Sequence, residues 1–294
     1  MTTAKKILGL LGRGIGYSYS PLIHNTALEI LGLPYYYTIF DVADHDRIGI
    51  ALKGAAALGI AGFNVTTPYK QTVVPFLDEL SPEAASIRAV NTIVNREGRL
   101  QGHNTDIAGF ASPLFQYGEA ISRSKAAIFG IGGAALAAIE AFRIYFSIRE
   151  ILLFVRDGEK AFSMLQSSPS KDLVTIVQMD KLLSGDDTTV GNLNTCSVLV
   201  NATPVGTKGR ADASQSIVPS SAGLIRKGQI VYDMVYNPYE TPLLSDARKT
   251  GAETVPGIEM LIGQAARSFE LWTGNAMPVD KVRPVVLKAL TGTP

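Results

Sequence analysis

The sequence predicts an α/β protein of two domains, an N-terminal α/β domain with a mixed sheet and a Rossmann-like doubly wound domain. Two observations predict this class. Short apolar runs alternate with helical patterns along all 294 residues, which is typical of α/β folds. A glycine-rich turn at residues 130–134 follows an apolar run and opens a helical stretch, as in nucleotide-binding domains. A chain of this length exceeds what one hydrophobic core usually supports, so two domains are expected.

The first half of the chain predicts a mixed sheet. Four short apolar runs are typical of strands: residues 7–11, 35–42, 62–65 and 92–95. Two segments between them have helical apolar spacing: residues 21–31 and 45–58. Pro21 suits a first helical turn and Gly32 suits a helix end. Residues 95–98 predict a hairpin turn into a further strand at 99–102.

The second half predicts buried parallel strands. Five compact apolar runs have this character: residues 126–129, 151–155, 174–177, 198–201 and 230–233. A helix is expected from 134 to about 146, and residues 186–192 are expected to form a surface loop. Two amphipathic helices at 258–273 and 279–290 are expected to return to the first domain.

Composition argues against several classes of partner. Lys and Arg number 27 against 26 Asp and Glu, so the net charge of +1 provides no attraction for nucleic acid or an anionic membrane. Cys196 is the only cysteine and cannot form an internal disulfide, which fits a reducing, cytoplasmic compartment. None of the three histidines has metal-ligand company in the sequence, so no metal is expected.

The glycine-rich turn predicts a dinucleotide site. Gly130, Gly132, Gly133 and Ala134 lie between a strand and a helix, where glycines let backbone N–H groups approach a pyrophosphate. The pattern is shorter than the full G-x-G-x-x-G, and an ordinary strand-to-helix turn is the alternative. The strand before it and the helix after it favour nucleotide binding.

The charges after the next strand bear on which cofactor binds. Arg156 follows Gly133 by 156 − 133 = 23 positions, near the usual spacing of about 20. An arginine here favours the 2′-phosphate of NADP, and Lys160 adds a second cation. Asp157 would favour the free ribose hydroxyl of NAD. A solvated charge run is the alternative, and we expect NADP, with NAD as the second choice.

Two pairs of polar residues suggest chemistry in the first half. Lys70 and Asp106 each follow a β-like run, and a cation and a carboxylate that share a proton suggest an oxidoreductase beside a dinucleotide loop. A structural ion pair is the alternative. Ser18 and Ser20 would point the same way from an extended segment and could bind a carboxylate or a polyol. Turn or helix-capping serines are the alternative.

Seven motifs in order resemble the shikimate dehydrogenase family, including its quinate/shikimate members, over residues 8–274. They are residues 16–25, 64–70, 89–92, 103–106, 201–206, 233–238 and 257–264. The resemblance implies that Lys70 and Asp106 are the catalytic pair. It implies substrate contacts from Ser18, Ser20, Thr66, Asn91, Tyr236 and Gln264. It also implies cofactor contacts from Gly130, Gly132, Gly133, Ala134, Arg156 and Lys160. Further cofactor contacts are expected from Asp157, Thr203 and Gly257.

The chain departs from the family pattern beside these motifs. The family usually has histidine where Tyr17 stands. It usually has aspartate or a similar polar residue before Asn104-Thr105-Asp106 and glycine after it, where this chain has His103 and Ile107. Leu136 stands near a position where many members carry arginine. These positions lie beside the expected substrate and cofactor, so they bear on which substrate binds.

The resemblance implies a shikimate dehydrogenase of the shikimate pathway of aromatic amino acid biosynthesis. Such an enzyme reversibly reduces 3-dehydroshikimate to shikimate with NADP, as a monomer or homodimer. The alternatives are a quinate or dual quinate/shikimate dehydrogenase that uses NAD, and a non-catalytic metabolite sensor on the same fold. Residues 1–106, completed by 258–294, are expected to bind substrate, and residues 107–257 the cofactor. The active site is expected in the cleft between them.

Overall fold

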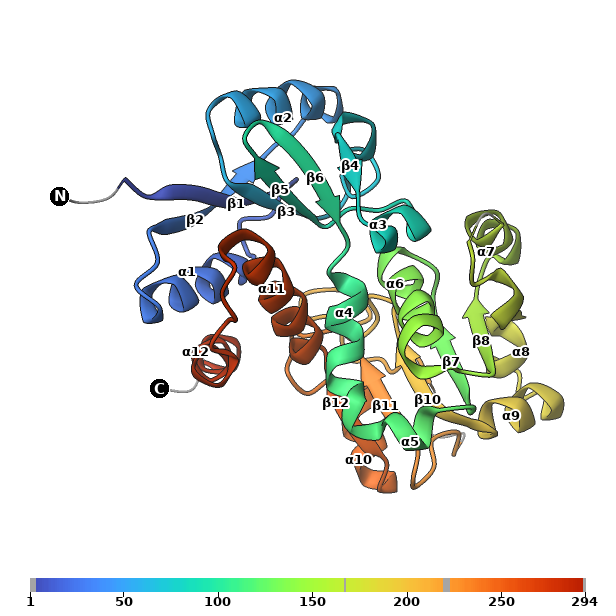
Figure 1. The fold of residues 1–294 in the computed structure, drawn as a ribbon. Helices are drawn as coiled ribbons and strands as arrows, with labels where there is room; N and C mark the ends of the chain where they lie inside the picture. The colour runs from blue at the N-terminus through green and yellow to red at the C-terminus, as the bar shows by residue number, and fades with distance from the viewer. Residues whose placement is uncertain (1–3, 167, 219–222, 293–294) are drawn as a thin grey trace. The chain divides into compact units, whose positions relative to one another are not determined.

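The computed structural model describes residues 4–166, 168–218 and 223–292. The chain divides into two compact units (Figure 1). The first unit contains Met1–Gly109 and Ile262–Pro294, and the second contains Phe110–Leu261. One unit carries a mixed sheet and the other a parallel sheet, so the predicted two-domain α/β class is confirmed.

The first unit is built on a six-stranded mixed sheet. Its order is β2 (Tyr35–Asp41), β1 (Lys6–Gly12), β3 (Gly62–Val65), β5 (Thr92–Arg96), β6 (Arg99–His103) and β4 (Glu79–Leu80). Strand β1 is parallel to β2 and β3, whereas β5 is antiparallel to β3 and β6. The four predicted strands are present. The two-residue strand β4 was not predicted, because so short a segment has no readable apolar pattern.

The predicted hairpin between β5 and β6 is also present. Glu97 and Gly98 both have positive φ, 54° and 90°. Two successive residues of this conformation match the twist of the strands that they join. Asn95 stabilises the turn, since its side-chain oxygen accepts a hydrogen bond from Gly98 N at 2.8 Å.

The helices of the first unit come from both ends of the chain. They are α1 (Ser20–Ile30), η1 (His45–Arg47), α2 (Ile48–Ala57), η2 (Val74–Phe76), α3 (Pro82–Ile87), α4 (Asp106–Ala111), α11 (Gly257–Thr273) and α12 (Val279–Thr291). Trp272 on α11 donates its indole N–H to Ile93 O of β5 at 2.9 Å. A side chain at Gly62 would clash with this indole, so the glycine lets α11 lie against the sheet.

The second unit has a six-stranded parallel sheet. Its order is β12 (Glu253–Pro256), β11 (Ile230–Asp233), β10 (Cys196–Asn201), β7 (Lys125–Phe129), β8 (Glu150–Val155) and β9 (Val174–Gln178). Five of these strands were predicted and β12 was not. The chain runs outward from β7 in both directions, which makes the boundary between β7 and β10 the switch point where ligands usually bind.

The helices of the second unit differ from prediction in two places. They are η3 (Ser112–Tyr117), α5 (Gly118–Ile121), α6 (Gly133–Ala141), η4 (Phe142–Phe146), α7 (Gly158–Leu165), η5 (Lys171–Leu173), α8 (Met179–Leu183), α9 (Asp187–Asn194) and α10 (Pro242–Thr250). The loop predicted at 186–192 is wrong: Asp186 accepts from Thr189 N at 2.8 Å and caps α9. The helix predicted to 146 is α-helical only to Ala141 and continues as a π-helical turn.

Candidate active site

Lys70 and Asp106 form an ion pair in the first unit. Lys70 lies in the turn after β3, and Asp106 is the first residue of α4, which begins three residues after β6 ends. The Lys70 Nζ–Asp106 Oδ2 distance is 2.6 Å. The lysine side chain is 26% exposed and the aspartate side chain 10%. The ammonium group therefore remains open to a ligand, while the carboxylate is mostly enclosed.

Asn91 holds the carboxylate from the other side. Its amide nitrogen donates to Asp106 Oδ1 at 2.8 Å and to Thr105 Oγ1 at 2.9 Å. Its amide oxygen accepts from Thr105 N at 2.7 Å. Both amide hydrogens are thus used inside the protein. In this conformation Asn91 orients Asp106, and a substrate hydroxyl would have to share the same amide.

A buried hydrogen-bond network lies behind this pair. Asn64 on β3 donates to Thr92 Oγ1 at 3.1 Å and to Ser268 Oγ on α11 at 2.9 Å. Thr92 Oγ1 in turn donates to Asn91 Oδ1 at 3.1 Å. Tyr37 closes the far end by donating to Asn64 Oδ1 at 2.8 Å. Because each side chain fixes the next, the network holds Asn91 and Asp106 in one geometry.

Ser268 and Thr92 were missed by the sequence analysis. Ser268 lies four residues after Gln264, on the same side of a helix, and this spacing was the available signal. Thr92 was predicted as the start of a strand and lies in the motif at residues 89–92, but no site role was assigned to it. Most of their hydrogen-bond partners are distant in sequence, so local patterns give little sign of either role.

Ser18 and Ser20 meet, but not by strand alternation. Their hydroxyl oxygens lie 3.2 Å apart, and Ser20 N donates to Ser18 Oγ at 3.2 Å. The expected extended segment is wrong, because Tyr19 between them has helical φ and ψ of −81° and −6°. Neither serine is the cap residue of α1, which is Tyr19 and has no side-chain cap bond. The two hydroxyls form a small polar pair at the start of a helix.

Thr66 and Gln264 complete the predicted substrate residues of the first unit. Thr66 follows β3, and its methyl carbon would be 2.6 Å from a Cβ at Gly12, at the end of β1. Gln264 lies on α11. Both side chains are partly exposed. Tyr236, the remaining predicted substrate residue, is partly exposed and belongs to the second unit.

The glycine turn has the geometry of an anion-binding site. Gly130 has φ of 95°, and a Cβ there would lie 2.6 Å from Thr203 Cγ2, so the ends of β7 and β10 meet closely. A Cβ at Gly132 or Gly133 would meet nothing within 4 Å. Open space therefore lies over the first residues of α6, Gly133 and Ala134, where backbone N–H groups can approach a diphosphate. These residues fit the expected cofactor.

The charged residues after β8 surround the start of α7. Arg156, Asp157 and Lys160 are all exposed. Asp157 is the cap residue of α7, since its Oδ1 accepts from Lys160 N at 2.9 Å. This carboxylate has a structural role that the sequence analysis did not assign. The two cations are thus placed at a helix N-terminus, which itself favours a negative charge.

A second polar network supports the loops of the second unit. Asp233 accepts hydrogen bonds from Asn201 Nδ2, Val235 N and Thr241 Oγ1 at 2.9, 3.0 and 2.6 Å. Burial raises the pKa of Asp233 to about 6, although these donors oppose the shift. Asn201 also accepts from Thr203 Oγ1 at 2.7 Å. The loops that carry Thr203 and Tyr236 are therefore tied to one carboxylate.

Gly257 allows a close backbone contact beside the Tyr236 loop. A Cβ at this position would lie 2.6 Å from Met234 O and Val235 O. Gly257 is buried at the start of α11. Gly257 is therefore needed for backbone packing, and this packing does not conflict with its predicted contact with the cofactor.

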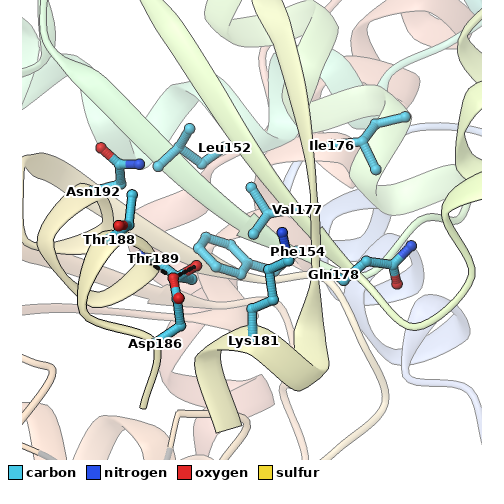
Figure 2. Close-up of a pocket in the computed structure, with 10 residues that line it drawn as sticks. All are labelled: Leu152, Phe154, Ile176, Val177, Gln178, Lys181, Asp186, Thr188, Thr189 and Asn192. Carbon is cyan, nitrogen blue, oxygen red and sulfur yellow. Dashed lines mark hydrogen bonds between the residues drawn. The ribbon is translucent and has the colours of Figure 1, made fainter. Parts of the chain in front are cut away.

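A separate cavity of about 400 Å³ lies at the β9 edge of the parallel sheet. Figure 2 shows its lining from β8, β9, α8 and α9, with the Asp186–Thr189 hydrogen bond at one side. None of the predicted site residues lines this cavity. It borders the edge strand β9, two strands from β7.

Within residues 4–166, 168–218 and 223–292, no group of three or more His, Cys, Asp or Glu side chains is arranged to hold a metal ion. Over the same described ranges, no helix has the length and apolarity needed to cross a membrane.

The fold and site together define a class of protein. A parallel sheet with a glycine turn at its switch point is a Rossmann-like nucleotide-binding domain. The first unit, which has the mixed sheet, carries a lysine–aspartate pair with an open ammonium group. This combination is that of a dinucleotide-dependent oxidoreductase with a separate substrate domain.

Comparisons with known proteins narrow the class. Residues 10–93 match the family model described as shikimate dehydrogenase substrate binding domain, and residues 257–287 match the shikimate 5′-dehydrogenase C-terminal domain. Proteins named shikimate dehydrogenase (NADP(+)) from Chlorobium phaeobacteroides and Chlorobaculum tepidum are 57% and 59% identical. The alignments cover 100% of this chain and of the first relative, and 98% and 97% for the second.

A solved structure of similar fold carries the same family name as these relatives. Shikimate 5-dehydrogenase from Listeria monocytogenes, in complex with shikimate and NAD, superposes with a TM-score of 0.86 at 33% identity. The match covers 96% of each chain. The chain belongs to the shikimate dehydrogenase family.

Proposed function

We propose that the protein catalyses the reversible, NADP-dependent reduction of 3-dehydroshikimate to shikimate. The full-length relatives at 57% and 59% identity carry this activity in their names. The observation that carries the chemistry is the 2.6 Å contact between Lys70 and Asp106, with Asn91 on the second carboxylate oxygen. A metabolite sensor has no need of a proton-transfer pair held in this way.

Lys70 is the proton donor in this proposal. The cofactor supplies a hydride to the carbonyl carbon, so negative charge develops on the substrate oxygen. The Lys70 ammonium stabilises that charge and transfers a proton to it. Asp106 holds the ammonium in place and balances its charge before transfer. Oxidation of shikimate uses the same groups in reverse.

The substrate residues divide by the groups that they recognise. Ser18 and Ser20 hold the substrate carboxylate with their adjacent hydroxyls. Thr66, Asn91 and Gln264 contact the ring hydroxyls, with Asn91 acting also on Asp106. Tyr236 is assigned to the carboxylate end of the substrate, as the family resemblance implies.

The cofactor residues bind through backbone and charge. Gly130, Gly132, Gly133 and Ala134 receive the diphosphate at the start of α6. Arg156 and Lys160 neutralise the 2′-phosphate of NADP, and Thr203 and Gly257 border the same site. Asp157 caps α7, which leaves its carboxylate less suited to read the ribose of NAD.

This proposal assigns residues 1–106 and 258–294 to the substrate and residues 107–257 to the cofactor. We further propose a cytoplasmic enzyme, supported by the unpaired, buried Cys196, which suits a reducing compartment. The expected monomer or homodimer is distinguished by light scattering of the purified protein.

One assay matrix tests the function. Shikimate and quinate are each supplied with NADP and with NAD, and nicotinamide absorbance is followed. We expect the highest kcat/KM with shikimate and NADP. A higher value with quinate would make the protein a quinate dehydrogenase, and no turnover in any of the four mixtures would overturn the proposed activity.

A further inference from the structure

Helices α4 and α11 approach each other unusually closely at Gly109. A Cβ at Gly109 would lie 2.6 Å from Gln264 N, 2.7 Å from Gln264 Cβ and 2.9 Å from Gln264 Cα. Real Cβ contacts are never this short, and none of these three atoms can move away by rotation of a side chain. The spacing of the two helices at this point therefore depends on the absence of a side chain at Gly109.

This close approach lies one helical turn from Asp106. Residues three apart in an α-helix share a face, so Asp106 and Gly109 lie on the same side of α4. The Gln264 side chain begins beside that face, because its Cβ is among the atoms next to Gly109. The separation of α4 and α11 at Gly109 thus sets how far the Gln264 side chain stands from Asp106.

Hydrogen bonds of Ser268 hold the same turn of α11. The Ser268 hydroxyl donates to Gln264 O at 2.9 Å and accepts from Asn64 Nδ2 at 2.9 Å. It also lies 3.1 Å from Thr105 Oγ1, in the residue directly before Asp106. The Gln264 turn is therefore tied by hydrogen bonds to the network that orients Asp106, while Gly109 allows the contact distance.

We propose that Gly109 is a positioning residue that sets the place of Gln264 relative to Asp106, with Ser268 fixing the same turn. The proposal rests on the proposed function, because it takes Gln264 as a substrate contact. A methyl group at position 109 would push α11 outward and move the Gln264 amide away from the substrate hydroxyl. Substrate binding should therefore be weakened more than the rate of proton transfer by Lys70 is lowered.

Gly109→Ala is the primary test, with Gly54→Ala as its matched control. Gly54 is also helical, lies in α2, and a Cβ there meets nothing within 4 Å. For Gly109→Ala we expect KM for shikimate to rise about tenfold, the loss of one hydrogen bond, with kcat changed less than about threefold. Gly54→Ala should leave both constants unchanged. Equal KM values in wild type and Gly109→Ala would overturn the proposal.

A double-mutant cycle separates positioning from general damage. If Gly109 acts through Gln264, then Gly109→Ala combined with Gln264→Ala should have the KM of the worse single variant. If the fold-changes in KM of the two single variants multiply in the double variant, the proposal is contradicted. Should Gly109→Ala fail to fold, Ser268→Ala is read in the same cycle, with the same expected KM rise and the same non-additivity.

The outcomes also separate this proposal from the proposed function. Wild-type turnover of shikimate with a normal KM in Gly109→Ala and Ser268→Ala rejects the positioning role alone. Absence of wild-type turnover rejects the function. If Gln264→Ala itself binds shikimate normally by calorimetry, Gln264 is not a substrate contact and the positioning proposal fails with the activity intact.

Discussion

The two units hold their candidate functional residues in different ways. In the first unit, the candidate catalytic side chains hold one another: Lys70, Asp106 and Asn91 are linked by contacts of 2.6 and 2.8 Å and backed by a buried network. In the second unit, the candidate cofactor site consists of glycine backbone, a helix start and the exposed cations Arg156 and Lys160. Proton transfer needs one fixed geometry. A phosphate, in contrast, can be attracted by exposed cations without a single fixed contact.

The units also contain buried titratable groups of opposite behaviour. His24 in the first unit is fully buried and stacks on Tyr37 with ring centroids 4.4 Å apart. Burial lowers the pKa of His24 to about 3. Asp233 in the second unit is equally buried, and burial raises its pKa to about 6. Both groups favour their neutral forms, so acid should affect the two units in opposite directions.

The largest expected effect breaks the fixed pair in the first unit. Lys70→Ala removes the proton donor, and Asp106→Asn removes the charge that holds it. Each should lower kcat by about a thousandfold, with a much smaller change in KM, because the lost interaction is strongest in the transition state. Steady-state kinetics with shikimate measure both constants. Turnover near that of the wild type in either variant would make the pair a structural ion pair.

The next effect is on the pH dependence of stability. As pH falls from about 6 to about 4, the unfolded chain protonates His24 while the folded protein does not, which destabilises the fold by about 2–3 kcal/mol. Over the same window the folded protein protonates Asp233 before the unfolded chain does, which stabilises the fold by a similar amount.

Two variants separate these opposing contributions. Asp233→Asn should make the protein lose stability more steeply on acidification, because only the His24 contribution remains. His24→Phe keeps an aromatic ring against Tyr37 and should show the reverse, a gain on acidification. Urea unfolding at several pH values measures each free energy. Parallel pH profiles for wild type and both variants would show that neither group titrates as described.

A smaller effect concerns substrate anchoring in the first unit. Ser18→Ala or Ser20→Ala removes one hydroxyl from the pair that meets at 3.2 Å. Loss of a hydrogen bond to a charged carboxylate is worth about 1.5–3 kcal/mol, so KM should rise at least tenfold with kcat less affected. Tyr19, not either serine, occupies the cap position of α1, so thermal stability should change little. Unchanged KM in both variants would leave the serines as turn residues only.

The smallest expected effect is on the cofactor preference of the second unit. Arg156→Ala should lower the ratio of kcat/KM for NADP over NAD by about tenfold, because a planar cation on the 2′-phosphate is lost. Asp157→Ser should raise that ratio by removing a negative charge, and serine can still cap α7. A wild-type enzyme with higher kcat/KM for NAD would show that Asp157, not Arg156, reads the ribose.

Local patterns determined the fold class and most of the elements of this protein. The glycine turn after β7 was recognisable because it lies between an apolar run and a helical run, where glycines permit a tight strand-to-helix turn. The hairpin at Glu97 and Gly98 was also predictable, because a hairpin turn depends only on neighbouring residues. The capped helix α9 was not recognised, because its polar composition resembles a loop and only the Asp186 cap distinguishes it.

The tertiary structure alone decided how the site residues support one another. Nothing near Asn91 in sequence indicates that its amide would hold Asp106, 15 residues later, or that Ser268 would reach Asn64, 204 residues before it. Gly109 gave no turn signal, and its importance appears only where α11 crosses it at Gln264. Sequence patterns report local propensity and burial, whereas these contacts arise when distant segments fold against one another and fill a shared space.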